Sequence, residues 1–235
     1  MAIGGLVAVG AVPTGAFAAG AVLGGRYSVP EWLRAGTQHF AVGSVVAAIA
    51  VDLIPLLQGH SEVAVTVGIA LGAGVSLALG RTSEAEESHP SRALHLALLV
   101  TTGIDVLFDG LLLGVGLTHS HVRLTLALAL GLENLPLGLA IAAHLRYRHP
   151  PGRWKLAVAG GLTAVLPAGL LVGAEVGDHL QGVLFTGLVA FGAAALLFLA
   201  TEQLIVEAHA MKHSTWSNLA LFFGFWLIIL LDALA

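Results

Sequence analysis

Cysteine is absent from this 235-residue chain, which excludes disulfides and thiolate metal ligands. Charge is scarce as well, because Asp, Glu, Lys and Arg make up only 10% of the residues, whereas a soluble domain carries about 25%. The first 25 residues also lack the positive charge that opens a secretory signal peptide. What is abundant is apolar: 57% of the residues are hydrophobic. These features exclude an ordinary soluble domain and predict an integral membrane protein.

Apolar runs long enough to cross a bilayer recur along the whole sequence, since a spanning helix needs about 20 apolar residues. Eight segments qualify: 2–25, 36–57, 62–80, 93–118, 122–145, 153–177, 181–208 and 214–234. We therefore predict an all-α, polytopic protein with a single transmembrane domain over residues 1–235. Residues 81–92 are expected to form a short polar cytoplasmic loop. The 30 glycines indicate close helix packing, which would permit a homodimer without requiring one.

The basic residues predict the orientation in the membrane. If eight helices have both termini outside, nine of the ten Lys and Arg residues fall on inner loops and only Arg123 falls on an outer loop. Such an excess of Lys and Arg is typical of the cytoplasmic side. We expect both termini outside and a location in a bacterial-type inner (plasma) membrane.

Three acids interrupt the fourth and fifth apolar segments: Asp105, Asp109 and Glu133. A charge at that depth costs at least about 2.5–3.5 kcal/mol, and such residues pair, bind ions or line a pathway. All three fall near the middle of their segments, and Asp105 and Asp109 share a helix face because they are four residues apart. Three carboxylates cannot all stay ionised together without a cation or protons. We predict a cation site of these acids, with Asn134 as a weaker candidate ligand.

Pro136 lies inside the fifth segment, where it removes one backbone hydrogen bond. The carbonyl of Leu132 that is freed in this way can face a cavity. The alternative interpretation is a structural kink without a role in a site.

The fourth segment carries Asp105-Val-Leu-Phe-Asp109-Gly and the fifth carries Glu133-Asn-Leu-Pro136-Leu-Gly138. Matching motifs on opposed helices are typical of an inverted repeat. They resemble the His-Asn-x-Pro-Glu-Gly-like motifs of the ZIP family (Zrt-, Irt-like proteins) of divalent-metal transporters. Residues 201–209 resemble that family's Glu-Glu-Leu-Ile-Pro-Glu-Ala-His stretch on helix seven, and residues 52–55 resemble its Leu-Pro-containing stretch on helix two. The resemblance covers nearly the whole chain.

The resemblance implies eight helices in a 3+2+3 arrangement and import of a transition-metal ion, such as zinc, iron, manganese or cadmium, as the substrate. Five positions depart from the family motifs. The family has His at Asp105, Asn at Val106, Pro at Phe108 and an acid at Leu137, and some relatives have Glu at Leu166. The second metal position of a two-metal site is thus expected to be lost. The remaining oxygen ligands favour harder ions over strict zinc selectivity, although zinc also accepts carboxylates.

Further polar residues are candidates for a transport pathway or its entrance. The pathway candidates are Asp52, Pro136, Glu202, Glu207 and His209. The entrance candidates on predicted outer loops are His60, His119, His121, Asp178 and His179. The alternative interpretations are helix pairing for the former group and ordinary loop residues for the latter.

Three other functions stay open on the sequence alone. A divergent relative could bind or sense metal without transporting it, or the acids could carry protons in a transporter of another solute. An intramembrane metalloenzyme is disfavoured because there is no His-Glu-x-x-His motif and no evident nucleophile. We therefore expect a transporter and no enzyme, with the lipid bilayer and a metal ion as partners and no nucleic acid.

Overall fold

The computed structural model describes residues 3–88, 92–118, 124–147, 152–177, 179–210 and 215–234, and within these ranges the chain is helical with short turns and no strand. Eight spans are long and apolar enough to cross a membrane, which fits an integral membrane protein. Six spans are single helices: α1 (Ile3–Arg26), α4 (Glu62–Ser88), α5 (Arg92–Thr118), α6 (Leu124–Tyr147), α7 (Gly152–Gly177) and α10 (Thr215–Leu234).

The second and seventh spans each contain a short π-helical segment. In the second span, α2 (Glu31–Ala48) passes through the segment Ile49–Leu53 into α3 (Ile54–Leu57). In the seventh, α8 (Val183–Phe198) passes through Leu199–Leu204 into α9 (Ile205–Ala210). Pro55 follows the first of these segments and lacks the N–H that a regular helix needs there. Short π-helical segments are frequent at functional sites.

Two boundaries differ from the sequence prediction. The second span begins at Glu31 rather than at residue 36, directly after Pro30. The helix α4 continues to Ser88 and so occupies most of the segment 81–92 that was expected to be a loop. Hydropathy marks only the apolar part of a helix, whereas Arg, Glu and Ala are strong helix formers that extend it into a polar region.

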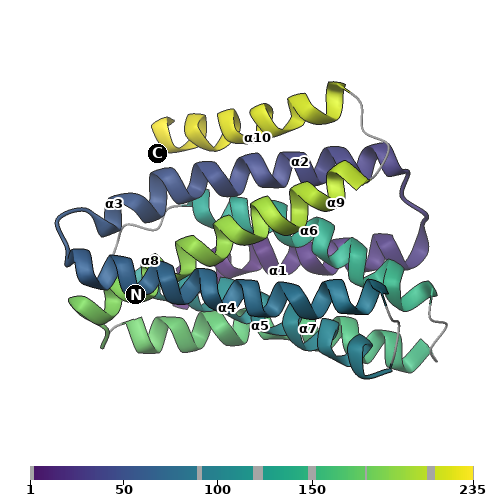
Figure 1. Cartoon of the computed structure of the whole chain (residues 1–235), viewed down its shortest axis with the longest axis horizontal. Helices are drawn as coiled ribbons and strands as arrows, with labels where there is room; N and C mark the ends of the chain where they lie inside the picture. Colours follow the sequence, from purple (N-terminus) through teal and green to yellow (C-terminus); the bar gives the residue numbers. More distant parts are fainter. Residues whose placement is uncertain are drawn as a thin grey trace.

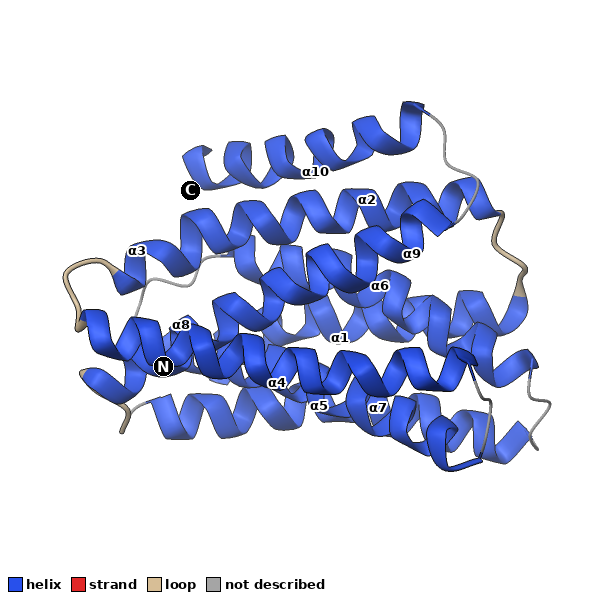
Figure 2. Ribbon diagram, in the orientation of Figure 1, coloured by secondary structure: helices blue, strands red, loops and turns tan. Residues whose placement is uncertain are grey.

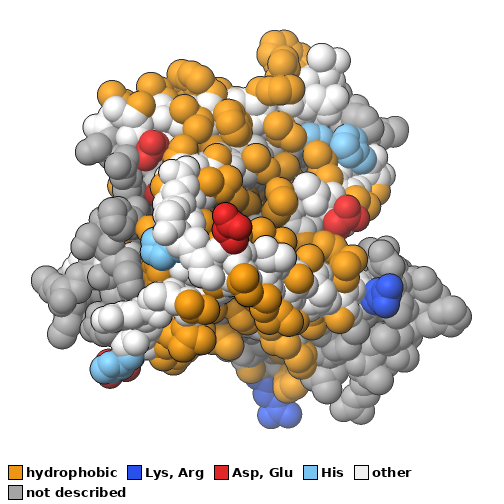
Figure 3. Space-filling view, turned by 60° about the vertical axis from the view of Figure 1, so that its left-hand side comes forward, with side chains coloured by type: hydrophobic (Ala, Val, Ile, Leu, Met, Phe, Trp, Pro, Cys, Tyr) orange, Lys and Arg blue, Asp and Glu red, His pale blue; other side chains and the backbone are white. Residues whose placement is uncertain are grey.

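The helices lie side by side along the long axis of the molecule, and successive spans run in opposite directions (Figures 1 and 2). The start of α1 and the end of α10 lie at one end of the bundle, here called the terminal end (Figure 1). The other end, called the basic end, carries all the Lys and Arg residues of the described part of the chain. One face of the bundle is covered largely by hydrophobic side chains with isolated charged ones between them (Figure 3).

Four helix pairs pack most closely: α1 with α6, α5 with α7, α2 with α10, and α4 with α8. In order of spans, these pairs are one with five, four with six, two with eight, and three with seven. The set of pairs is symmetric. If spans one, two and three change places with spans six, seven and eight, and span four changes places with span five, the same four pairs result. The same exchange relates the two spans that contain π-helical segments.

Glycine allows the backbones to touch in every one of these pairs. A Cβ atom on Gly24 of α1 would lie 2.6 Å from the carbonyl oxygen of Leu139 in α6. The glycines of this kind are Gly20, Gly24 and Gly138 between α1 and α6; Gly110, Gly114, Gly169 and Gly173 between α5 and α7; Gly43 and Gly224 between α2 and α10; and Gly68 and Gly72 between α4 and α8. Small residues at such contacts are the usual basis of helix association in membranes.

Gly24→Ala is predicted to destabilise the protein by about 1–3 kcal/mol, because its methyl group overlaps the backbone of α6. Gly25→Ala is the matched control, since its Cβ would meet nothing within 4 Å. The measurement is thermal unfolding in detergent, followed by circular dichroism. Equal unfolding temperatures for the two variants would refute the packing role of Gly24.

Candidate functional site

A buried hydrogen bond joins the fourth and fifth spans near the middle of the bundle. The Nδ2 amide of Asn134 on α6 donates to the Oδ2 carboxylate oxygen of Asp109 on α5 at 2.8 Å, and also to the carbonyl of Leu130 at 2.9 Å. Asp109 is 3% exposed and Asn134 is fully buried. The two bonds orient the amide through its nitrogen and leave the Oδ1 oxygen of Asn134 as an acceptor.

Glu133 lies beside this pair on α6 and is 1% exposed. Neither of its carboxylate oxygens, nor the Oδ1 oxygen of Asn134, has a hydrogen-bond partner among the described residues. Glu133 directly precedes Asn134 in α6, and Asn134 bonds Asp109, so Glu133 lies near that carboxylate. Buried polar oxygens without partners are rare in folded proteins and call for an explanation, such as a bound ion.

Asp105 lies one turn before Asp109 on α5 and is only half-buried. Within the described ranges, no three His, Asp or Glu side chains are grouped closely enough to hold a metal ion together. The predicted ligands are therefore brought together in part: Asp109 contacts Asn134, while Asp105 and Glu133 lie in the vicinity. Metal binding by the four residues stays a prediction.

Three of the five positions at which the sequence departs from the ZIP motifs belong to one apolar cluster, and a fourth, Phe108, contacts another aromatic ring. Val106 and Leu166 are fully buried in one cluster of α1, α5, α6 and α7, and Leu137 packs against it. Phe108 stacks on Phe191 of α8, with ring centroids 4.7 Å apart. Apolar side chains thus occupy the positions at which a second metal would need acids or amides.

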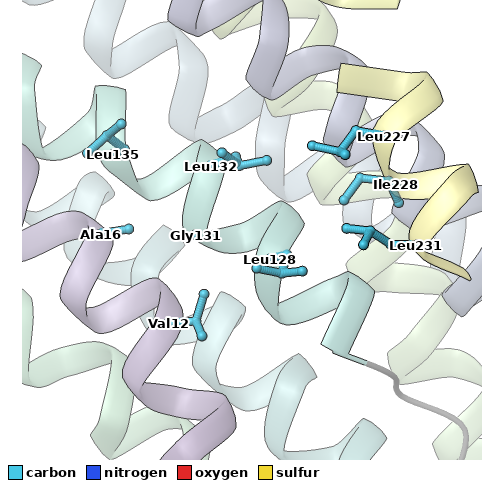
Figure 4. Close-up of a pocket in the computed structure, with 9 residues that line it drawn as sticks. All are labelled: Val12, Ala16, Leu128, Gly131, Leu132, Leu135, Leu227, Ile228 and Leu231. Carbon is cyan, nitrogen blue, oxygen red and sulfur yellow. The ribbon is translucent and has the colours of Figure 1, made fainter. Parts of the chain in front are cut away.

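Pro136 is buried inside α6, which continues without interruption to Tyr147. Two other residues of this helix, Leu132 and Leu135, line a pocket of about 250 Å³ between α1, α6 and α10 (Figure 4). The nine residues that line the pocket are all apolar or glycine, and neither Glu133 nor Asn134 is among them. This pocket therefore offers no polar or charged side chain to a cation.

A second polar contact lies nearer to the terminal end. The hydroxyl of Thr125, at the start of α6, donates to the Oδ2 oxygen of Asp52 at 2.7 Å. Asp52 belongs to the π-helical segment of the second span, and both side chains are buried. The structure thus ties the second and fifth spans together at one of the predicted pathway residues.

The other predicted residues are spread over both ends of the bundle. Glu202 and His209 in the seventh span are exposed, and the side chain of Glu207 is outside the described part. His60 and His179 are exposed in turns at the terminal end. The remaining entrance candidates, His119, His121 and Asp178, lie outside the described residues.

Sequence reasoning missed two polar residues that the structure singles out, Thr125 and His39. A threonine in a membrane helix usually bonds its own backbone, so no pattern marks Thr125 as a partner of Asp52. His39 was overlooked because the second span was expected to begin at residue 36, which placed this histidine at its edge. It lies two turns inside the observed helix and is 2% exposed.

No family model matches the chain, and no curated protein matches it either.

Thr125→Val is predicted to destabilise the protein by about 1–3 kcal/mol, because it removes the donor to a buried carboxylate while keeping the shape. Thr163→Val is the matched control, since the Thr163 hydroxyl bonds only the Ala159 carbonyl of its own helix. Thermal unfolding in detergent compares the two variants. If Thr125→Val lowers the unfolding temperature no more than Thr163→Val does, the hydrogen bond between Thr125 and Asp52 does not stabilise the protein measurably.

Proposed function

We propose that the chain is a ZIP-type transporter that imports a divalent metal cation through one central site. Asp109, Glu133 and Asn134 form the core of this site, and Asp105 joins them from the preceding turn of α5. The observation that carries the proposal is the set of buried oxygens without hydrogen-bond partners on Glu133 and Asn134, next to the Asp109 carboxylate. A cation would satisfy these oxygens and offset the repulsion between the acids.

The chemistry of the donors sets the class of substrate. Carboxylate and amide oxygens favour harder ions such as Mn²⁺ and Fe²⁺, whereas imidazole ligands would favour Zn²⁺. Because Zn²⁺ also accepts carboxylate oxygens, Zn²⁺ and Cd²⁺ remain in the proposed class of substrates. The apolar cluster around Val106 and Leu166 supports a single metal position. The metal is the cargo of the protein, so an open coordination shell that exchanges ligands is what transport requires.

The packing of the helices supports the proposed 3+2+3 arrangement. The four closest pairs keep the same pairing when the first three spans change places with the last three and span four changes places with span five. This symmetry is expected for a transporter built from two repeats with its site at the repeat interface. The gathering of Lys and Arg at the basic end supports a cytoplasmic location of that end. Both termini would then lie outside, in a bacterial-type inner membrane.

The proposed route runs from the terminal end to the basic end. The contact between Asp52 and Thr125 lies near the start of α6, and Asn134 lies nine residues beyond Thr125, or about 14 Å along a helix. An ion from outside would pass Asp52 before it reaches Asp109. Movement of one group of helices against another would then open the site to the inside.

A non-transporting, metal-binding relative is the second candidate. Asp105 and Leu137 favour it, because they stand where the family motifs have a histidine and an acid, so ligands that the family's transporters use are missing. The two candidates share the binding site and differ in whether the ion crosses the membrane.

Metal uptake into proteoliposomes tests the transport proposal, with Mn²⁺, Fe²⁺, Zn²⁺, Cd²⁺ and Mg²⁺ compared. Asp109→Asn keeps an oxygen that can accept the bond from Asn134 but removes the charge. We expect this variant to reduce flux about tenfold or more, since loss of a group that merely supports a ligand already costs about 10–100-fold in affinity.

Glu175→Gln is the matched control, because it removes an exposed carboxylate from α7 and should leave flux unchanged. Absence of flux for every ion, from protein that is folded, would overturn the transport proposal and leave the binding relative. Equal flux in the wild type and in Asp109→Asn would overturn the assignment of the site.

A further inference from the structure

His39 is a buried histidine with one of its two ring nitrogens left without a partner. Its Nδ1 atom lies 2.7 Å from the carbonyl oxygen of Ala35, one turn earlier on α2. Its Nε2 atom is buried and has no hydrogen-bond partner among the described residues. A buried polar atom in this state is destabilising relative to one with a partner.

The carbonyl of Ala35 determines which nitrogen carries the hydrogen. A carbonyl can only accept, so Nδ1 must be the donor. In the neutral ring, Nε2 then presents its lone pair on the side away from Ala35. Histidines that bind metals have this arrangement, because a hydrogen bond from the other ring nitrogen sets the tautomer and the direction of the ring.

A second imidazole lies against this ring. His209 of α9 approaches His39 edge to face, with ring centroids 5.3 Å apart and an angle of 89° between the planes. Two imidazoles that bind one tetrahedral ion at about 2.0–2.1 Å would have their centroids roughly 5 Å apart. The observed separation is compatible with a shared ion as well as with an edge-to-face ring contact, and His209 is exposed.

The pair belongs to the second and seventh spans, whereas the central acids belong to α5 and α6. His39 precedes Asp52 by thirteen residues in the same span, or about 20 Å along a helix, and so lies toward the basic end. No third His, Asp or Glu of the described chain completes the group. Two protein ligands with water in the remaining positions make an open site from which an ion can leave.

We propose that His39 and His209 form a two-imidazole binding site for a borderline divalent cation such as Zn²⁺. Imidazole favours Zn²⁺, Cu²⁺ and Ni²⁺ over Mn²⁺ and Mg²⁺, in contrast to the oxygen ligands of the central site. As a station for ions on their way out of the central site, the pair rests on the proposed transport function. Binding of an ion to the pair can be measured whether or not transport occurs.

Zn²⁺ titration calorimetry on the purified full-length protein in detergent tests the site, in an Asp109→Asn background that removes a central ligand. His39→Phe keeps a ring at the contact with His209 but removes the nitrogen. His209→Phe does the same at an exposed position that tolerates replacement. His144→Phe is the matched control, because it removes a half-buried imidazole from the last turn of α6 at the same end of the bundle.

We expect His39→Phe and His209→Phe each to weaken Zn²⁺ binding about tenfold or more and His144→Phe to leave it within about twofold, as for loss of one of few ligands. Electron paramagnetic resonance of bound Cu²⁺ should show coupling to two imidazole nitrogens, which either of the first two variants reduces to one. Unchanged Zn²⁺ affinity in His209→Phe, or a Cu²⁺ spectrum without nitrogen coupling, would overturn the proposal and leave an edge-to-face contact between helices.

The assay separates this proposal from the transport proposal. Zn²⁺ binding that depends on both histidines, without flux in proteoliposomes, would support the site and reject transport. Flux that depends on Asp109, with Zn²⁺ binding indifferent to both histidines, would support transport and reject the site.

Discussion

Close backbone contact at glycine is the constraint on which the rest of this structure depends. Inside a bilayer, lipid tails are as apolar as leucine, so helices associate through tight packing rather than through the hydrophobic effect. The contact of Gly24 with α6 is one of a series that holds each of the four helix pairs at short range. The polar side chains in the bundle take their positions from these pairs.

The helices that carry the central polar residues also carry an apolar cluster. Asp109, Glu133 and Asn134 bring oxygen atoms into the bundle where α5 and α6 meet. Val106 and Leu166 belong to an apolar cluster that draws on the same two helices and on α1 and α7.

The sequence predicted the membrane spans, which depend on hydropathy. It did not predict which side chains touch, because those contacts depend on how each helix is rotated about its axis. Eight spans follow from runs of apolar residues, and the acids of α5 and α6 stood out because charge is rare in such runs. Which side chains touch depends on how each helix is turned about its axis, and composition does not record this. The bond from Thr125 to Asp52 and the meeting of His39 with His209 therefore appeared only in the structure.

The bond between Asp109 and Asn134 crosses from one tightly packed helix pair to another. The helix α5 is joined to α7 through glycine contacts, and α6 is joined to α1 in the same way, whereas α5 and α6 touch each other much less. Each pair will therefore tend to move as a unit. This bond joins two such units, so a displacement of one unit relative to the other would have to break it.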